Sequence, residues 1–234
     1  MMLITRPEDD AKKLSMILDH KQIAYHRDSL ISFSVLSKNE INITNNIFLI
    51  SSIQAIHSLQ KNNLFKNSDL VSGSFYVIGK RSSQLLKELG MVQVENTFSD
   101  FDSFNNFLVQ SKIKTQINYL CGDIISQEAE MAVETKKLNK IILYRTIAAK
   151  QFSDETIQLM SSGKIDSVIL YSKHTSSIYQ QLLIKHGMEE PARDIEYYCL
   201  SMRIAEFMQE KGYNRCIVCD YPDQDSMISA IEKK

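Results

Sequence analysis

The chain has 234 residues, of which 44% are hydrophobic and 24% charged, with a formal net charge of −1 at pH 7. This balance is typical of a globular protein and gives no electrostatic support for a nucleic-acid or membrane partner. No apolar run approaches the length of a membrane span, and the N-terminal segment turns acidic without the apolar stretch of a signal peptide, so we expect a cytoplasmic protein.

Short apolar runs alternate with helical patterns along the whole chain. The runs that indicate strands are Met2–Thr5, Ile23–Tyr25, Ile31–Val35, Ile47–Ile50, Ser74–Ile78, Ile117–Leu120, Lys140–Tyr144, Ser167–Tyr171, Tyr197–Leu200 and Cys216–Cys219. Helical patterns follow Pro7 and fill Gln54–Leu59, Ser82–Leu89, Ser126–Thr135, Asp154–Met160, Ser176–Lys185 and Ile204–Glu210. This alternation predicts an α/β fold in which helices cover both faces of parallel sheets.

Two parts of the chain repeat. Phe75–Met91 and Tyr197–Tyr213 each read as an apolar strand, a small residue, an arginine two places later, and a helix that runs to a glycine. Ile47–Leu59 and Val168–Tyr179 form a second pair, in the same order and at nearly the same separation. The repeat predicts duplicated α/β domains. At the start of each helix, backbone N–H groups and the helix dipole form a site suited to carboxylates or phosphates.

The cysteines and histidines do not indicate a metal site. Cys216 and Cys219 form a CxxC pattern, but they lie in a predicted strand, where positions three apart face opposite sides of the sheet. No histidines have the HExxH or zinc-finger spacing. We therefore expect no metal, no cofactor and no disulfide.

A family resemblance follows from six short motifs in order: Thr5-Arg6-Pro7, Ile50-Ser51-Ser52, Val77-Ile78-Gly79-Lys80-Arg81-Ser82, Leu143-Tyr144-Arg145-Thr146, Tyr171-Ser172 and Cys219-Asp220-Tyr221-Pro222. Over nearly its whole length the chain resembles the uroporphyrinogen-III synthase family. The resemblance implies two flavodoxin-like domains with parallel sheets that face each other across a cleft, joined by a short two-stranded connection. Residues 1–32 plus 149–234 would form the first domain, and residues 34–143 the second, inserted domain. The repeat alone indicates a division into two halves instead.

The resemblance also implies an activity. The family consists of lyases of haem biosynthesis that cyclise hydroxymethylbilane, a linear tetrapyrrole, to uroporphyrinogen III with inversion of ring D and loss of water. The family implies a monomer with a small-molecule substrate. Tyr144 matches the family tyrosine whose hydroxyl assists departure of the substrate hydroxide, and a phenol is protonated at neutral pH and can donate. The structural alternative is a strand-end tyrosine with a packed ring and a solvated hydroxyl.

The substrate carries eight carboxylates, and the resemblance places them at the turns between strands and helices. The candidate binding residues are Ser51, Ser52, Gly79, Lys80, Arg81, Ser82, Tyr171, Ser172, Ser201 and Arg203. Serine hydroxyls at such turns also cap helices, and charged side chains there are commonly just solvated. Where the family has threonines after the small residue of the second copy, this chain reads Ser201-Met202-Arg203-Ile204, so Arg203 is the candidate replacement.

Two alternatives stay open: a non-catalytic two-domain small-molecule-binding protein, and an inactive member of the family. Nucleotide binding has less support, because neither GxGxxG nor GxxxxGKS/T occurs.

Overall fold

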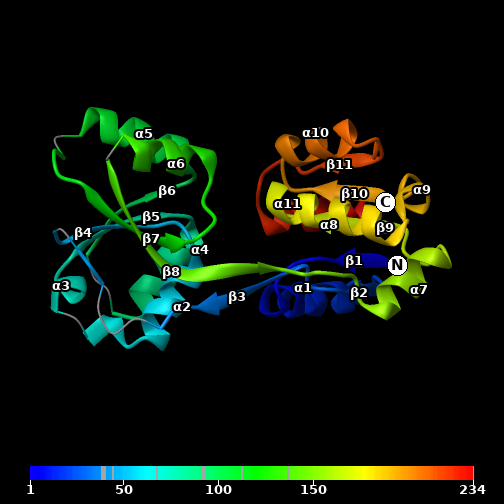
Figure 1. Cartoon of the computed structure of the whole chain (residues 1–234), viewed down its shortest axis with the longest axis horizontal. Helices are drawn as coiled ribbons and strands as arrows, with labels where there is room; N and C mark the ends of the chain where they lie inside the picture. The colour runs from blue at the N-terminus through cyan, green and yellow to red at the C-terminus, as the bar shows by residue number, and fades with distance from the viewer. Residues whose placement is uncertain are drawn as a thin grey trace. The chain divides into compact units, whose positions relative to one another are not determined.

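The computed structural model of the chain describes residues 1–37, 41–43, 45–66, 68–90, 93–111, 113–135 and 137–233. The chain divides into two compact units (Figure 1). Unit 1 comprises Met1–Ser32 and Ile147–Lys234, and unit 2 comprises Phe33–Thr146. Unit 1 is therefore built from both ends of the described chain, with unit 2 inserted between them.

Unit 1 contains a five-stranded sheet with the order β11-β10-β9-β1-β2, in which every neighbouring pair is parallel. Its strands are β1 (Met2–Ile4), β2 (Tyr25–Arg27), β9 (Ser167–Leu170), β10 (Glu196–Cys199) and β11 (Cys216–Val218). Its helices are α1 (Glu8–His20), α7 (Asp154–Ser161), α8 (Lys173–His186), α9 (Glu189–Ala192), α10 (Met202–Glu210) and α11 (Gln224–Glu232).

Unit 2 contains a six-stranded sheet with the order β3-β8-β7-β4-β5-β6, whose last five members run parallel. Its strands are β3 (Ile31–Val35), β4 (Ile47–Ile50), β5 (Ser74–Ile78), β6 (Val94–Phe98), β7 (Ile117–Gly122) and β8 (Leu138–Ala148). Its helices are α2 (Ile53–Lys61), the short 3-10 helix η1 (Leu64–Lys66), α3 (Ser68–Val71), α4 (Lys80–Glu88), α5 (Phe101–Gln110) and α6 (Gln127–Glu134).

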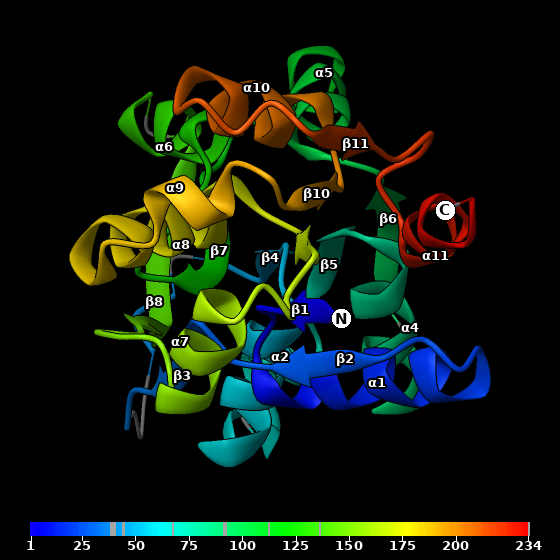
Figure 2. The same cartoon turned by 90° about the vertical axis from the view of Figure 1, so that its right-hand side faces the viewer.

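Helices cover both faces of each sheet (Figures 1 and 2). In β9, Val168 and Leu170 pack in one apolar cluster with α8 and α10, whereas Ile169 packs in another with α1 and α11. In β4, Ile50 and Leu49 divide in the same way between a cluster with α2 and a cluster with α5 and α6. Strands buried on both faces read as continuous apolar runs, as predicted. The predicted class of two parallel α/β sheets is confirmed.

The chain passes between the two units in β3 and β8. The Leu36 N–H donates to the Leu143 carbonyl over 2.9 Å, and the Ala149 N–H donates to the Leu30 carbonyl over 2.8 Å. Residue numbers rise along one strand while they fall along the other, so β3 and β8 are antiparallel. This pairing makes β8 longer than the expected Lys140–Tyr144.

The parallel strands of the two sheets have the same spatial arrangement, but the chain enters that arrangement at a different strand in each unit. When the parallel strands of each unit are numbered 1 to 5 along the chain, their order across the sheet is 2-1-3-4-5 in unit 1, which is the flavodoxin order, and 3-2-1-4-5 in unit 2. The two match when β9, β10 and β11 are superposed on β4, β5 and β6. The repeat in the sequence falls on the β4–β5 and β9–β10 segments, which are continuous in both units. Met91, the end of one copy, lies outside the described residues.

A third pair of segments extends the repeat. The helix α5 begins at Asp100, whose carboxylate accepts the Ser103 N–H over 2.7 Å, and α11 begins at Asp223, whose carboxylate accepts the Ser226 N–H over 2.8 Å. Both segments carry Asp-x-Asp-Ser, after β6 and β11 respectively. The elements α5, α11 and β6 were not predicted from the sequence.

Several element boundaries differ from those expected. The second strand begins at Tyr25 rather than Ile23, because the residues after α1 form its C-terminal turn. Gln22 has a φ of 55°, and the Ile23 N–H is bonded to the Leu18 carbonyl over 3.0 Å. In the repeat, α4 and α10 begin at Lys80 and Met202, earlier than expected. The polar residues assigned to these two turns therefore lie largely in the first turn of a helix.

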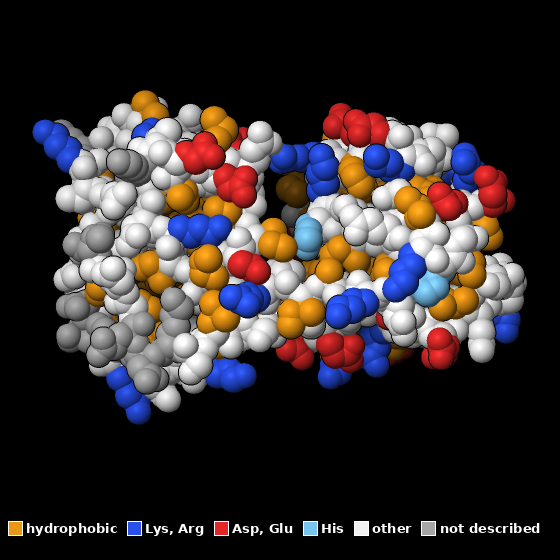
Figure 3. Space-filling view, in the orientation of Figure 1, with side chains coloured by type: hydrophobic (Ala, Val, Ile, Leu, Met, Phe, Trp, Pro, Cys, Tyr) orange, Lys and Arg blue, Asp and Glu red, His pale blue; other side chains and the backbone are white. Residues whose placement is uncertain are grey.

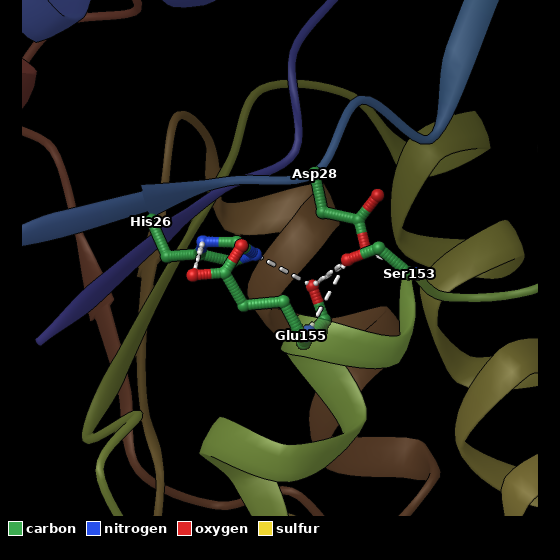
Figure 4. Close-up of polar contacts among 5 residues, drawn as sticks. His26, Asp28, Ser153 and Glu155 are labelled. Atoms are coloured by element: carbon green, nitrogen blue, oxygen red, sulfur yellow. Dashed lines mark hydrogen bonds and ion pairs between the residues drawn. The ribbon is translucent and has the colours of Figure 1, made fainter.

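Side-chain hydrogen bonds fix the start of α7, the first helix after the chain re-enters unit 1 (Figure 4). Asp28 accepts the Ser153 N–H over 2.8 Å and the Thr156 hydroxyl over 2.6 Å. The Thr156 oxygen lies 2.9 Å from His26 Nε2. Because Thr156 donates its single hydrogen to Asp28, its oxygen accepts from the Nε2–H of His26.

Candidate active site

The parallel strands of unit 2 all end at one edge of their sheet, and that edge carries most of the candidate residues of this unit. Ser51 and Ser52 follow β4, Gly79 follows β5, and Tyr144 lies in β8 opposite Gly122, near the end of β7. In open α/β sheets this edge is the usual place for ligands.

Tyr144 and Ser52 are in direct contact. The Tyr144 hydroxyl donates to Ser52 Oγ over 3.1 Å, although the two residues are 92 positions apart. Tyr144 is 7% exposed, and its ring meets that of Phe33 edge-on at 5.5 Å. Burial raises the pKa of Tyr144, with the hydrogen bond to Ser52 opposing, so the phenol is protonated at neutral pH. The ring is packed, as in the structural alternative, but the hydroxyl is bound to Ser52.

Ser52 also begins α2. Its Oγ accepts the Gln54 N–H over 3.1 Å, so the capping role that the sequence allowed is present here. Ser51 makes a different contact: its Oγ lies 2.7 Å from the Tyr119 hydroxyl, on the side of the sheet that packs against α5 and α6. Burial raises the pKa of Tyr119. Tyr119 was not predicted to be a site residue from the sequence.

Gly122, the last residue of β7, and Asp123, which follows it, position Tyr144, and neither was predicted from the sequence. A Cβ atom at Gly122 would lie 2.5 Å from Cε2 of Tyr144, so only glycine leaves room for the ring. Asp123 donates its N–H to the Tyr144 carbonyl over 3.1 Å, and its carboxylate accepts the Thr146 N–H over 2.9 Å. The sequence feature that could have identified them is the Gly-Asp pair at the end of the buried strand β7.

The turn after β5 exposes its charged residues and buries its serine. Gly79 has a φ of 94°, a conformation that favours glycine, and its N–H donates to the Phe98 carbonyl over 2.8 Å. Lys80 and Arg81 are exposed at the start of α4, and Ser82 is 5% exposed. Gly79, not Ser82, is the N-cap residue, and no side chain caps α4. The capping role considered for Ser82 is therefore wrong.

The turn after β9 in unit 1 pairs a tyrosine with a capping serine. Ser172 Oγ accepts the Thr175 N–H over 3.1 Å at the start of α8. The guanidinium of Arg6 lies 4.0 Å from the centre of the Tyr171 ring and 3.1 Å from the Asp10 carboxylate. Burial raises the pKa of Tyr171, and Arg6 opposes that rise. Arg6, which belongs to one of the motifs, had no assigned role in the sequence analysis.

The turn after β10, like the turn after β5, has no side-chain hydrogen bond that caps the following helix. Ser201 occupies the N-cap position of α10, but its side chain makes no capping bond. Arg203 is exposed in the first turn of α10. The structure therefore brings Tyr144 and Ser52 into contact within unit 2, and it places Tyr171, Ser172, Ser201 and Arg203 along the equivalent edge of unit 1.

The charges on the surface are mixed. On the face drawn in Figure 3, Lys and Arg side chains are interspersed with Asp and Glu on each unit. On this face, a ligand rich in carboxylates would be met by local groups, chiefly helix N-termini and single cations.

Within the described ranges, no group of three or more His, Cys, Asp or Glu residues could hold a metal ion. Cys216 Sγ contacts the Tyr213 carbonyl and Cys219 Sγ contacts Met227, in clusters on opposite faces of the sheet. The expected divergence of the CxxC sulfurs is confirmed. Among the helices that the structure describes, none combines the length and the apolar character needed to cross a membrane.

These features define a protein of two parallel α/β units, each with polar residues where its strands lead into helices. The sequence model of the family described as Uroporphyrinogen-III synthase HemD matches residues 34–229. The chain belongs to this family. The family assignment, the lyase class and the place in porphyrin and haem biosynthesis predicted from the sequence are confirmed, and proteins of the family act on a tetrapyrrole.

Solved structures show the same fold. The uroporphyrinogen-III synthetase of Helicobacter pylori is 12% identical, with a TM-score of 0.65 over 100% of this chain and 99% of that chain. A mutant uroporphyrinogen-III synthase from the extremely thermophilic bacterium Thermus thermophilus is 10% identical, with a TM-score of 0.63 and the same coverage. No curated protein matches the chain.

Proposed function

We propose that this chain cyclises hydroxymethylbilane to uroporphyrinogen III, with inversion of ring D and loss of water, and that Tyr144 and Ser52 lie where the hydroxide departs. Membership of the family supports the reaction. The hydrogen bond between the Tyr144 hydroxyl and Ser52 Oγ, at the carboxyl edge of a parallel sheet, is the observation that carries the assignment to these residues.

The chemistry asks the protein to stabilise a leaving hydroxide. When the terminal C–O bond of the substrate breaks, negative charge develops on oxygen, and a protonated donor lowers the energy of that state. The raised pKa of Tyr144 keeps its phenol protonated. The start of α2 at Ser52 adds the positive end of a helix dipole.

Substrate carboxylates are assigned to the starts of the helices. In unit 2 they would meet the first turn of α4, with Gly79, Lys80, Arg81 and Ser82, and Ser51 after β4. In unit 1 the corresponding groups are Tyr171, Ser172, Ser201 and Arg203. Backbone N–H groups of a first helical turn point along the helix axis, and exposed cations lie beside them, so these turns suit carboxylates without a basic surface.

We also propose that the protein acts as a monomer in the cytoplasm.

Turnover separates this function from the two alternatives. Fresh hydroxymethylbilane is mixed with the purified chain, and its loss is followed against the spontaneous rate. Catalysis predicts faster loss in proportion to protein concentration, and a slower rate in Tyr144→Phe. A binding protein or an inactive family member would consume substrate no faster than buffer, and that result would reject the proposal.

A further inference from the structure

We propose that Ser52 is the group that donates to the departing hydroxyl, and that Tyr144 acts through Ser52 as a positioning residue. This inference rests on the proposed function. It reassigns the contact with the reacting oxygen from the phenol to the serine.

The hydrogen bonds around Ser52 Oγ carry the argument. A hydroxyl has one hydrogen to donate and two lone pairs to accept with. Both acceptor positions of Ser52 are filled, by the Tyr144 hydroxyl at 3.1 Å and the Gln54 N–H at 3.1 Å. The Ser52 hydrogen therefore points to a third position, and within the part of the chain that the structure describes no acceptor for it is found.

Burial separates the two hydroxyl groups. Tyr144 is 7% exposed and gives its only hydrogen to Ser52. Ser52 is half-buried, at the sheet edge where a ligand can reach it. Tyr144 cannot give the same hydrogen to a substrate without releasing Ser52, so the accessible hydrogen of the pair belongs to Ser52.

The arrangement improves Ser52 as a donor. Hydrogen bonds in a chain polarise one another, so a serine that accepts from a phenol and from a backbone N–H donates more strongly than a solvated one. Its place at the first turn of α2 puts the developing negative charge near the positive end of a helix dipole.

The step balances without a proton change on the protein. The C–O bond breaks with its electron pair on oxygen, and the pyrrole ring electrons form the exocyclic C=C bond of an azafulvenium cation. Ser52 stabilises the hydroxide through a hydrogen bond and keeps its proton. The hydroxide then takes the pyrrole N–H proton and leaves as water, so a neutral azafulvene remains for ring closure.

Steady-state rates of isomer III formation by the full chain, measured at varied substrate concentration, test the inference. Ser52→Ala should lower kcat by roughly 100-fold with little change in KM, because the lost bond forms as the oxygen departs. Tyr144→Phe leaves the Ser52 hydrogen in place and should lower kcat only about tenfold. The double variant should match Ser52→Ala alone, because one residue acts through the other.

Three further variants separate chemistry from folding. Ser52→Gly removes the hydroxyl but is tolerated as an N-cap, and it should lose activity like Ser52→Ala. Ser52→Thr keeps cap and hydroxyl and should retain most of the rate. Ser126→Ala removes the matched N-cap of α6, where Ser126 Oγ accepts the Ala129 N–H over 3.3 Å, and should lower the melting temperature without lowering kcat.

The outcomes distinguish this inference from the function it rests on. If Tyr144→Phe loses as much as Ser52→Ala or more, or if the two losses multiply in the double variant, the inference is wrong. If the unmodified chain forms isomer III and Ser52→Gly does so equally fast, the inference also fails while the function stands. If the unmodified chain forms only isomer I, the proposed function itself fails.

Discussion

Gly122 and Tyr144 face each other across neighbouring strands at a distance that excludes any side chain on Gly122. A bulge between Cys121 and Gly122 shifts the register, so that Cys121 pairs with Ile142 and Gly122 with Tyr144. The Cβ of an alanine at position 122 would lie 2.5 Å from the tyrosine ring. The bulge thus sets where the Tyr144 hydroxyl lies.

Gly122→Ala should therefore displace the Tyr144 ring and weaken its bond to Ser52. We expect a loss of about 1–3 kcal/mol in the free energy of unfolding, typical of overpacking. The rate of isomer III formation should fall as in Tyr144→Phe. Urea unfolding and single-turnover kinetics measure both effects. In Gly122→Ala/Tyr144→Ala the clash is gone, so the stability losses should be less than additive; strict additivity would argue against the contact.

Gly79→Ala tests backbone conformation instead of space. Among the residues that the structure describes, none other than its chain neighbours comes within 4 Å of a Cβ at Gly79, but its φ of 94° is one that side chains rarely adopt. We expect a loss of about 1–3 kcal/mol in the free energy of unfolding from strain alone. Because α4 starts at the next residue, binding of a tetracarboxylate fragment at its first turn should weaken as well. An unchanged urea midpoint would show that the turn relaxes without strain.

Thr156→Val removes one hydroxyl from the network in Figure 4 at almost constant volume. Thr156 is fully buried, and both Asp28 and His26 lose a partner. The free energy of unfolding should fall by about 1–3 kcal/mol. Thr135→Val is the matched control, because Thr135 is exposed and bonds only to carbonyls of its own helix; its effect should stay within about 0.5 kcal/mol. Equal effects of the two substitutions would contradict a structural role for the network.

The cap of α5 should make stability depend on pH. The Ser103 N–H and the Ser99 hydroxyl, both bonded to Asp100, lower the pKa of its carboxyl. A lowered folded pKa stabilises the protein above the unfolded pKa, near pH 4, and the contribution is lost as the pH falls through the folded value. Asp100→Asn keeps an acceptor without the charge, so its deficit at pH 7 should shrink by about pH 3. The effect should be small and reduced by salt, because Asp100 is mostly exposed. A deficit constant over this range would count against the charged cap.

The alternation of strands and helices could be predicted because most strands are buried on both faces. The strand that was missed shows the limit: β6, at the edge of its sheet, reads Val-Glu-Asn-Thr-Phe, with three exposed residues in the middle. Because its central residues are polar, β6 does not have the apolar run that predicts a buried strand. The following helix α5 had a readable signal in Phe101, Phe104 and Phe107 at helical spacing, and in the Asp-x-Asp-Ser motif shared with α11.

The site was less predictable than the fold. Local patterns placed Ser52 at a helix start and Tyr144 in a strand, since both depend on neighbours in the sequence. Their contact depends on the order of β4, β7 and β8 across the sheet and on the bulge before Gly122. Neither the strand order nor the bulge can be predicted from the spacing of residues within one segment. The hydrogen bond and the role of Gly122 were therefore found only in the structure.

The isomer composition of the product distinguishes catalysis from spontaneous ring closure. Fresh hydroxymethylbilane is incubated with increasing amounts of the chain, the products are oxidised, and uroporphyrins I and III are separated. If the chain is a synthase, isomer III should replace isomer I as the protein concentration rises, and Ser126→Ala should behave like the unmodified chain. Isomer I alone, formed at the spontaneous rate at every concentration, would contradict it.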